Sequence, residues 1–267
     1  DWDANELSAS SSSLWAVSHS NADLVPEVYD QGSLGACTAF ATGLTLRGAV
    51  IKQLREDGVL NAVELSKTPS FLFLYYLARA THGMAAEDSG SWIRANFEVV
   101  NRFGWPDEEF WPYDDRKEWK PNGRPPKFAR LPSHKAFRAA YDRRSEAPKN
   151  KKLVEYRRIY ETGYARVQAV KKWSKEGYLI PFGTDVDEKF LRGDFNEGRP
   201  IYPPVGESRA GGHAMVIEGF NGDDFTIVNS WGRNYGINGR CIFSADYIAW
   251  DKSRDFWIAR RVPAEGT

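Results

Sequence analysis

A cysteine that follows a run of turn-forming residues is the strongest candidate for chemistry in this sequence. Cys37 comes directly after the glycine-containing stretch 30–36, and the apolar spacing of residues 37–56 predicts a long helix that begins at the thiol. A thiol in the first turn of a helix lies near the positive end of the helix dipole and near unpaired backbone N–H groups. Both features lower a thiol pKa and favour the nucleophilic thiolate. The alternative is a small buried hydrophobic residue, which is what most free cysteines are.

Two further segments supply a base and a polar residue that can orient it. His213 follows a Gly-Gly pair and begins an apolar run, which predicts a strand with room for a ligand beside the glycines. Asn229 ends a second apolar run, where its side chain can hold an imidazole by a hydrogen bond. Taken alone, each has a structural explanation, as a buried histidine or a turn asparagine. Together with Cys37 they supply nucleophile, base and orienting group in that order.

These segments resemble the three signatures of the papain family of cysteine peptidases, most of all its disulfide-poor bacterial members. The matching residues are Gln31-Gly32-x-x-Gly35-x-Cys37, then Gly212-His213-Ala214, then Asn229-Ser230-Trp231-Gly232 with Gly236 and Asn238-Gly239. Leu65-Ser66 fits the segment after the first helix, and Ser89-Gly90 fits the family's substrate-binding turn. The resemblance covers about residues 25–110 and 178–260.

The resemblance implies an α+β fold, in which a helical subdomain and an antiparallel β-barrel-like subdomain enclose the active cleft. It implies a cysteine endopeptidase that hydrolyses peptide bonds through a thioester acyl-enzyme, with protein or peptide substrates and no metal or organic cofactor. Two alternatives stay open. The same site can perform acyl transfer or deamidation, since a thioester accepts other nucleophiles, or the fold can be a catalytically silent binding scaffold.

The resemblance also assigns roles to individual residues. The implied catalytic residues are Cys37 as nucleophile, His213 as base, Asn229 as the residue that orients the imidazole, and Gln31, which forms the oxyanion hole with the Cys37 N–H. The implied substrate-binding residues are Ser89, Gly90, Gly212, Trp231 and Arg254. Among these, Trp231 is expected to cover the histidine–asparagine pair, and Ser89 and Gly90 to hydrogen-bond an extended peptide main chain.

Departures from the family pattern leave the candidate catalytic groups in place. Leu34 and Thr38 stand where the papain signature has a cysteine and an aromatic residue. His213 lies 176 positions after Cys37, and Asn229 lies 192 positions after Cys37. Both separations exceed the ~130–150 typical of the signature. The charged stretch 111–176 accounts for the excess.

Substrate specificity is expected to depend on a position just before an aromatic pair near the C-terminus. In the family, this position contributes to the floor of the pocket for the side chain two residues before the cleaved bond. Here it is Arg254, or Asp255 if the register differs by one. A guanidinium there favours an acidic substrate side chain and a carboxylate a basic one. The alternative is an apolar pocket lined by Met215 and its neighbours.

Composition changes along the chain and suggests four segments. They are a flexible N-terminal arm or pro-segment remnant at 1–22, a mainly helical subdomain at 23–110, a charged helical insertion at 111–176 and a β subdomain at 177–267. The insertion is expected to contain one or two helices, broken at Pro148 and at Gly163. A further hypothesis is that the arm, through Leu14, Trp15 and Val17, lies in the cleft as an inhibitory segment.

A hairpin between the two candidate site residues sets a geometric condition on the site. Asn221-Gly222 is a strong signal for a two-residue turn. A regular hairpin with this turn pairs His213 with Ser230, so that Asn229 faces the opposite side of the sheet. For His213 and Asn229 to share a face, the hairpin needs an odd loop or a β-bulge, and we predict one.

Composition excludes several classes of protein. Hydrophobic residues make up 42% and charged residues 27% of the 267 residues, which is typical of a globular chain and argues against wholesale disorder. The net charge of zero disfavours a nucleic-acid or membrane partner. No apolar run approaches the ~20 residues that span a bilayer. Because only two cysteines are present, a disulfide framework is absent, which favours the cytoplasm, with a secreted bacterial enzyme as the alternative.

Overall fold

A computed structural model describes residues 18–149, 151–206 and 210–262 of the chain. The helices are α1 (Cys37–Glu56), α2 (Ala62–Ser66), α3 (Phe71–Ala80), α4 (Ile93–Phe103), α5 (His134–Arg144), α6 (Gly163–Lys175), α7 (Glu188–Arg192) and α8 (Ala245–Ala249). The strands are β1 (Ser18–Ser20), β2 (Val154–Arg158), β3 (Ile180–Val186), β4 (Gly211–Asn221), β5 (Asp224–Val228), β6 (Arg240–Ser244) and β7 (Trp257–Arg261). Short 3-10 turns occur at Ala22–Leu24, Glu108–Phe110 and Lys127–Ala129.

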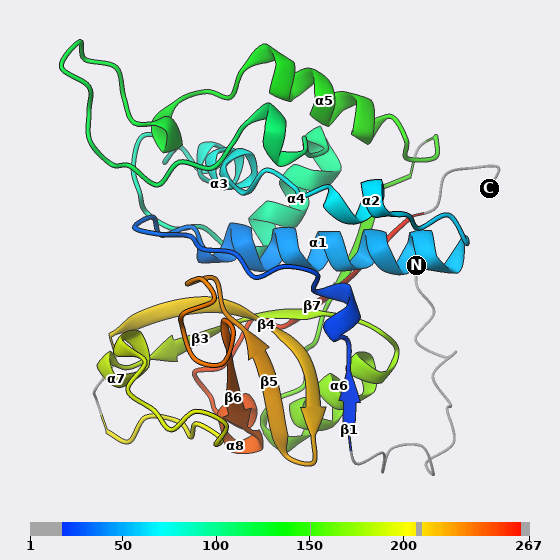
Figure 1. The fold of residues 1–267 in the computed structure, drawn as a ribbon, viewed down its shortest axis with the longest axis vertical. Coiled ribbons are helices and arrows are strands. Elements are labelled where there is room, and N and C mark those ends of the chain that lie inside the picture. The colour runs from blue at the N-terminus through cyan, green and yellow to red at the C-terminus, as the bar shows by residue number, and fades with distance from the viewer. Residues whose placement is uncertain (1–17, 150, 207–209, 263–267) are drawn as a thin grey trace.

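Two halves of different composition meet along helix α1 (Figure 1). Helices α3, α4 and α5 lie on one side of α1, and the main sheet lies on its other side, with α6 and α8 beyond that sheet. The helix-rich first part and the strand-rich last part predicted from the sequence are therefore both present. Among the described residues, no helix is long and apolar enough to cross a membrane.

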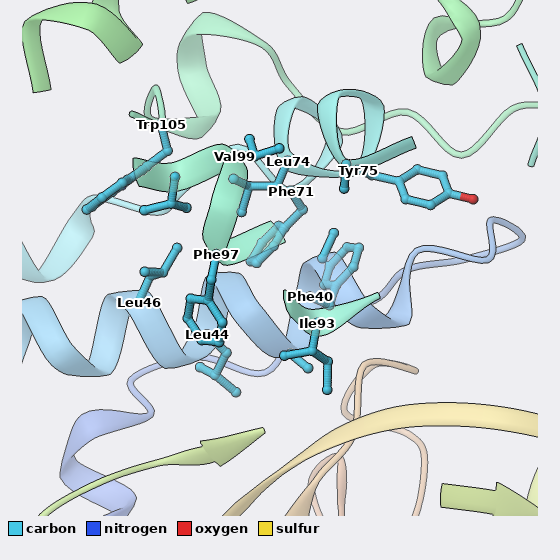
Figure 2. Packing of buried hydrophobic residues seen from close by; sticks show 14 of the residues in the cluster. Phe40, Leu44, Leu46, Phe71, Leu74, Tyr75, Ile93, Phe97, Val99 and Trp105 are labelled. Carbon is cyan, nitrogen blue, oxygen red and sulfur yellow. The ribbon is translucent and has the colours of Figure 1, made fainter. Parts of the chain in front are cut away.

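Helix α1 is buried over most of its length because both halves pack against it. On the helical side, the ring of Phe40 stacks on Phe71 of α3 with centroids 4.2 Å apart, and Figure 2 shows Phe97 of α4 beside the same cluster. Gly43 is required here, since a Cβ at this position would lie 2.6 Å from the Phe71 ring. Each of these buried aromatic side chains contributes about 1.5–3 kcal/mol to the free energy of unfolding.

The main sheet presents one face to each of two hydrophobic cores. Its strand order is β1-β4-β5-β6, with β3 also paired to β4, and all these pairs are antiparallel. Because side chains alternate along a strand, Ala214 and Val216 of β4 belong to the core shared with α1, whereas Met215 and Ile217 belong to a second core with Val167 of α6. The second core therefore packs against β4, the strand that carries a candidate site residue.

The hairpin of β4 and β5 contains the predicted irregularity. Phe220 pairs with Phe225 near the turn, whereas Ile217 pairs with Ile227, so the register shifts by one at Glu218. This β-bulge inserts one extra residue on β4. The prediction of a bulge or an odd loop is confirmed.

The turn of this hairpin lies one residue later than predicted. Asn221 pairs with Asp224, so the two turn residues are Gly222 and Asp223 rather than Asn221 and Gly222. Gly222 has a φ of +58° and Asp223 has no positive φ, which fits a type II′ turn with glycine at its first central position. The Asn-Gly signal was misleading because the glycine alone satisfies this turn type.

The stretch 111–176 is divided between the two halves. Helix α5 packs on α4, and strand β2 pairs with β7 near the C-terminus. Helix α6 packs on α8 and β4 of the other half. The two predicted helices exist, but the sequence analysis missed β2, whose residues are mostly charged.

The predicted N-terminal arm falls partly within the described residues. Ser18–Ser20 form edge strand β1 on β4, and the backbone N–H of Asn21 donates to the carbonyl of Glu218 in the bulge. Gly219 allows this close approach, because a Cβ there would lie 2.3 Å from the carbonyl oxygen of His19. For residues 18–22 the prediction of a flexible arm is therefore wrong. The inhibitory-segment hypothesis concerns Leu14, Trp15 and Val17, which lie outside the described residues.

Candidate active site

The Cys37 thiol lies at the N-terminus of α1, where the sequence predicted it. Ala36 precedes it and provides no side-chain cap. The N–H groups of Ala39 and Phe40 donate to the carbonyl of Ala36, whereas those of Cys37 and Thr38 face the sulfur. Burial raises the pKa of Cys37, while backbone hydrogen bonds with Ala214 and Thr38 act to lower it. The direction is opposite to the one expected from the sequence, because loss of water around the sulfur outweighs these hydrogen bonds.

The other cysteine has a different environment. Cys241 lies in β6, is 3% exposed and belongs to the second core. Burial raises the pKa of its thiol, and no backbone hydrogen bond opposes this. Cys241 therefore has the surroundings of a packing residue and no access to a cleft.

His213 lies in β4, and its ring is held by one hydrogen bond and one aromatic face. Its Nε2 is 2.8 Å from Oδ1 of Asn229, and the indole of Trp231 stacks on the imidazole with ring centroids 4.3 Å apart. Burial lowers the pKa of His213 to about 4, and the hydrogen bond with Asn229 raises it only in part. The imidazole is therefore neutral at pH 7.

A neighbouring backbone group fixes the direction of this hydrogen bond. Oδ1 of Asn229 also accepts the N–H of Ser230 at 2.7 Å, which identifies this atom as the amide oxygen. Since the oxygen can only accept, Nε2 of His213 carries the proton and Nδ1 keeps a lone pair. The arrangement gives a neutral imidazole whose Nδ1 is able to accept a proton.

The side chain of Gln31 is fixed at both ends of its amide. Oε1 accepts from the hydroxyl of Ser230 at 2.6 Å, and Nε2 donates to the carbonyl of Leu34 at 2.8 Å. The backbone N–H of Gln31 donates to the carbonyl of Ser230 at 2.8 Å. Because an amide nitrogen has two hydrogens, one N–H of Gln31 remains for another acceptor.

A cleft of about 610 Å³ lies between the two halves. Six sequence-predicted site residues line it, namely Cys37, Ser89, Gly90, Gly212, His213 and Arg254. Gln31, Asn229 and Trp231 lie outside this lining. In the part of the chain that the structure describes, no group of three or more His, Cys, Asp or Glu residues is arranged to hold a metal ion.

The predicted specificity position lies at the cleft, but its charge is already paired. Nη2 of Arg254 is 3.0 Å from Oδ1 of Asp185, whose side chain is 9% exposed against 57% for the arginine. Asp255 also lines the cleft, with its carboxylate 3.7 Å from Arg158. The apolar alternative placed Met215 here, and that is wrong, because Met215 is buried in the second core.

The sequence analysis missed several polar residues around the cleft. Leu34 is buried in the helical core. The hydroxyl of Thr38 is 2.5 Å from that of Ser91, which directly follows Ser89-Gly90. Asp88, directly before Ser89, accepts the backbone N–H of Gly35 at 2.9 Å. The position of Asp88 beside the Ser-Gly turn was the available signal, because a short acidic side chain there reaches neighbouring backbone donors.

Comparison with protein families and with known proteins agrees with this arrangement. A family model for the papain family cysteine proteases matches residues 12–248 of the chain. An uncharacterized peptidase C1-like protein of Acanthamoeba polyphaga mimivirus is 34% identical over 241 residues, which are 87% of this chain and 69% of that protein.

Solved structures show the same fold. Xylellain, a cysteine protease from Xylella fastidiosa, superimposes with a TM-score of 0.75 and 27% identity over 95% of this chain and 90% of that chain. Bromelain from Ananas comosus, solved in complex with the E64 inhibitor, matches with a TM-score of 0.60 and 20% identity over 92% of this chain and 99% of that chain. The expected α+β papain-like fold is confirmed, and the chain belongs to the papain family of cysteine proteases.

Proposed function

We propose that the protein is a cysteine endopeptidase that cleaves peptide bonds in the cleft between its two halves. Cys37 is the nucleophile, His213 the general base and acid, and Asn229 the residue that orients the imidazole. The single observation that carries the proposal is the fixed tautomer of His213, whose Nε2–H donates to Asn229 at 2.8 Å. This leaves a basic Nδ1 on a ring that lines the same cleft as the Cys37 thiol.

In the proposed reaction, His213 carries two protons in turn, one from the thiol to the leaving amine and one from water back to the sulfur. The thiol of Cys37 transfers its proton to Nδ1 of His213 as the sulfur bonds to the substrate carbonyl carbon. His213 then gives that proton to the leaving amine as the C–N bond breaks, which forms a thioester. Water attacks the thioester carbonyl, transfers a proton to His213, and the sulfur leaves and regains that proton. Because burial raises the pKa of the thiol and lowers that of the imidazole, both groups are neutral at rest, and the proton is expected to move together with the attack of the sulfur.

Charge that develops on the substrate carbonyl oxygen requires nearby donors. We assign this role to the free N–H of the Gln31 side chain and to the backbone N–H of Cys37. The support is that Gln31 is held by Ser230 at its oxygen and by the Leu34 carbonyl at its nitrogen, so its orientation is set before substrate binds. Removing one such donor typically lowers the rate by ~10²–10³.

The substrate main chain is proposed to lie along the turn that contains Ser89 and Gly90. Gly90 has a φ of +75°, a conformation that a side chain rarely adopts, and it lines the cleft opposite Gly212. A glycine at either position gives an extended peptide close access to the backbone, although the N–H of Gly90 itself donates to the hydroxyl of Tyr75 at 3.2 Å. Trp231 is proposed to act indirectly, by covering His213 and excluding water from its hydrogen bond with Asn229.

Arg254 is proposed to influence which substrate side chain is preferred. Its guanidinium lines the cleft and is paired with the nearly buried Asp185. An acidic substrate side chain would share the guanidinium, which has five N–H donors. A positional-scanning peptide library tests this proposal. We expect a preference for Glu or Asp two residues before the cleaved bond that Arg254→Ala removes, and an unchanged preference for Leu or Val would contradict it.

A fluorogenic peptide assay with and without a thiol-alkylating epoxide tests the proposed function. We expect peptide cleavage that the epoxide abolishes with modification of Cys37, and no cleavage by Cys37→Ala. Transfer of the acyl group to an added amine in preference to water would support the acyltransferase alternative. Inertness toward peptides and amines, with Cys37 unmodified by the epoxide, would support a silent scaffold.

A further inference from the structure

A segment without regular secondary structure contacts the loop that precedes the candidate nucleophile, through residues 113, 115 and 117. The hydroxyl of Tyr113 donates to the carbonyl oxygen of Gln31 at 2.9 Å. Oδ2 of Asp115 accepts the backbone N–H of Ser33 at 3.0 Å, and the backbone carbonyl of Asp115 accepts the Ser33 hydroxyl at 2.7 Å. These contacts tie Tyr113 and Asp115 to residues 31 and 33 of the loop.

Lys117 contacts the same loop indirectly, through the carboxylate of Asp88. Nζ of Lys117 is 2.6 Å from Oδ2 of Asp88, and Oδ1 of Asp88 accepts the backbone N–H of Gly35 at 2.9 Å. The hydroxyl of Tyr75 also donates to Asp88 and accepts the N–H of Gly90 at 3.2 Å. Burial acts to raise the pKa of Asp88, but hydrogen bonds from Lys117 and Tyr75 and at Gly35 outweigh it and lower that pKa. Asp88 is therefore an anion at neutral pH, and it joins the loop to the substrate-binding turn.

Residues 113–117 lie directly against the loop. Gly32 has a φ of +55°, and a Cβ at this position would lie 2.2 Å from Oδ2 of Asp115. A side chain at Gly32 would therefore displace the aspartate. On its other side the loop is tied to the sheet half, because the backbone N–H and side chain of Gln31 both bond to Ser230. Residues 31–36 are thus held between two sets of contacts, one from each half of the protein.

We infer that residues 113–117, which we name the brace, position residues 31–36, the oxyanion loop, and that Tyr113, Asp115 and Lys117 are positioning residues for the reaction proposed above. The inference rests on the proposed function, because the oxyanion loop carries Gln31 and leads into Cys37. None of the three brace residues lines the cleft. Their effect on catalysis is therefore exerted through the loop, by holding the two oxyanion donors where charge develops.

The brace contacts are expected to affect the reaction more than the stability of the fold. The contacts of Asp115 with Ser33 are solvent-exposed, and the side chain of Lys117 is 46% exposed. Exposed polar pairs of this kind contribute little to the free energy of unfolding. A displacement of an oxyanion donor by a fraction of an ångström, in contrast, reduces stabilisation of the transition state without changing how the substrate side chains bind.

Steady-state kinetics of four variants test the brace. Asp115→Ala removes the acceptor for the Ser33 N–H, and we expect kcat to fall about tenfold, a fraction of the loss for a deleted oxyanion donor, with KM changed less than twofold. Asp115→Asn keeps an acceptor oxygen and should restore most of kcat. Tyr113→Phe removes the hydroxyl donated to Gln31 and should also lower kcat. The matched control is Glu118→Ala, because Glu118 is an exposed acidic residue directly after the brace, and its kcat should be unchanged.

A double-mutant cycle identifies the group through which the brace acts. In a Gln31→Ala background, Asp115→Ala should lower kcat less than twofold, since the donor that it positions is already absent. A peptide aldehyde gives a second measurement, because its adduct with Cys37 places an oxyanion in the hole. Asp115→Ala should weaken aldehyde inhibition about tenfold, in line with the effect on kcat, and should leave the binding of a matched peptide amide unchanged.

The possible failures are distinguishable. If wild-type protein neither cleaves peptides nor forms the aldehyde adduct, the proposed function is wrong. If wild-type protein is active and Asp115→Ala keeps kcat and aldehyde affinity within twofold of wild type, the brace is wrong and the proposed function stands. Equal losses in Asp115→Ala and Glu118→Ala would also overturn the brace, because they would indicate a general effect of removing an acidic side chain near this segment.

Discussion

Replacing Asn229 by alanine should slow the reaction by an amount that follows from one hydrogen bond. Oδ1 of Asn229 accepts Nε2–H of His213 at 2.8 Å, and His213 is 6% exposed. The substitution leaves this buried N–H without a partner, which costs about 1–3 kcal/mol. The imidazole then loses its fixed orientation, so we expect kcat/KM to fall about 5- to 150-fold, at about tenfold per 1.4 kcal/mol.

The assay compares kcat/KM at pH 7 for wild type, Asn229→Ala and Asn101→Ala. Asn101 is the matched control, since its side chain also makes two hydrogen bonds, both to the backbone of Val154, on the far side of α1. The control should lose stability without a comparable loss of kcat/KM. If Asn229→Ala stays within twofold of wild type while it remains folded, Asn229 does not orient His213 and the argument from the fixed tautomer is refuted.

Three further outcomes follow from the burial of individual groups. Cys241→Ser should keep most of the activity that Cys37→Ala abolishes. Mass spectrometry after iodoacetamide treatment at pH 7 should find Cys37 labelled before Cys241, and the reverse order would show that Cys37 is not the nucleophile. Trp231→Ala should admit water to His213 and raise the pKa of the imidazole from about 4 toward the ordinary 6.5. The acidic side of the pH profile of kcat/KM should then move to higher pH, and an unchanged profile would contradict the covering role of Trp231. Burial raises the pKa of Glu108 to about 7, so this carboxyl ionises at lower pH in the unfolded chain than in the folded one, and the free energy of unfolding falls as pH rises from about 4.5 to 7. Glu108→Gln should therefore have a larger free energy of unfolding than wild type at pH 8, by up to about 3 kcal/mol, but not at pH 4. An equal difference at both pH values would count against this.

The candidate site was predictable because its determinants are local in the sequence. Cys37, His213 and Asn229 each stand beside residues that fix the local backbone, namely a helix start or the end of a strand. The bulge at Glu218 was predictable for a different reason. Strand side chains alternate with a period of two, so the need for His213 and Asn229 to share a face excluded a regular hairpin.

The brace and strand β2 were not predictable, because their determinants are distant in the sequence. The hydrogen bonds of Tyr113 to Gln31 and of Asp115 to Ser33 each join residues 82 positions apart. A segment without regular secondary structure has neither apolar periodicity nor capping residues to mark it. Strand β2 has the sequence VEYRR, which carries the charges of a solvated helix, and it is a strand because it pairs with β7.

The low pKa of His213 and the raised pKa of Cys37 have one physical origin. Trp231 and the buried surroundings of β4 remove water from the imidazole, and the contact between the two halves removes it from the thiol. Water removal disfavours either charge alone, but it strengthens the attraction between two opposite charges at short distance. A thiolate–imidazolium pair formed by internal proton transfer therefore loses less from burial than two separate ions would. The same burial that keeps both groups neutral at rest favours transfer of the proton between them over its release to solvent, and the N-terminus of α1 adds to the stability of the thiolate once it forms.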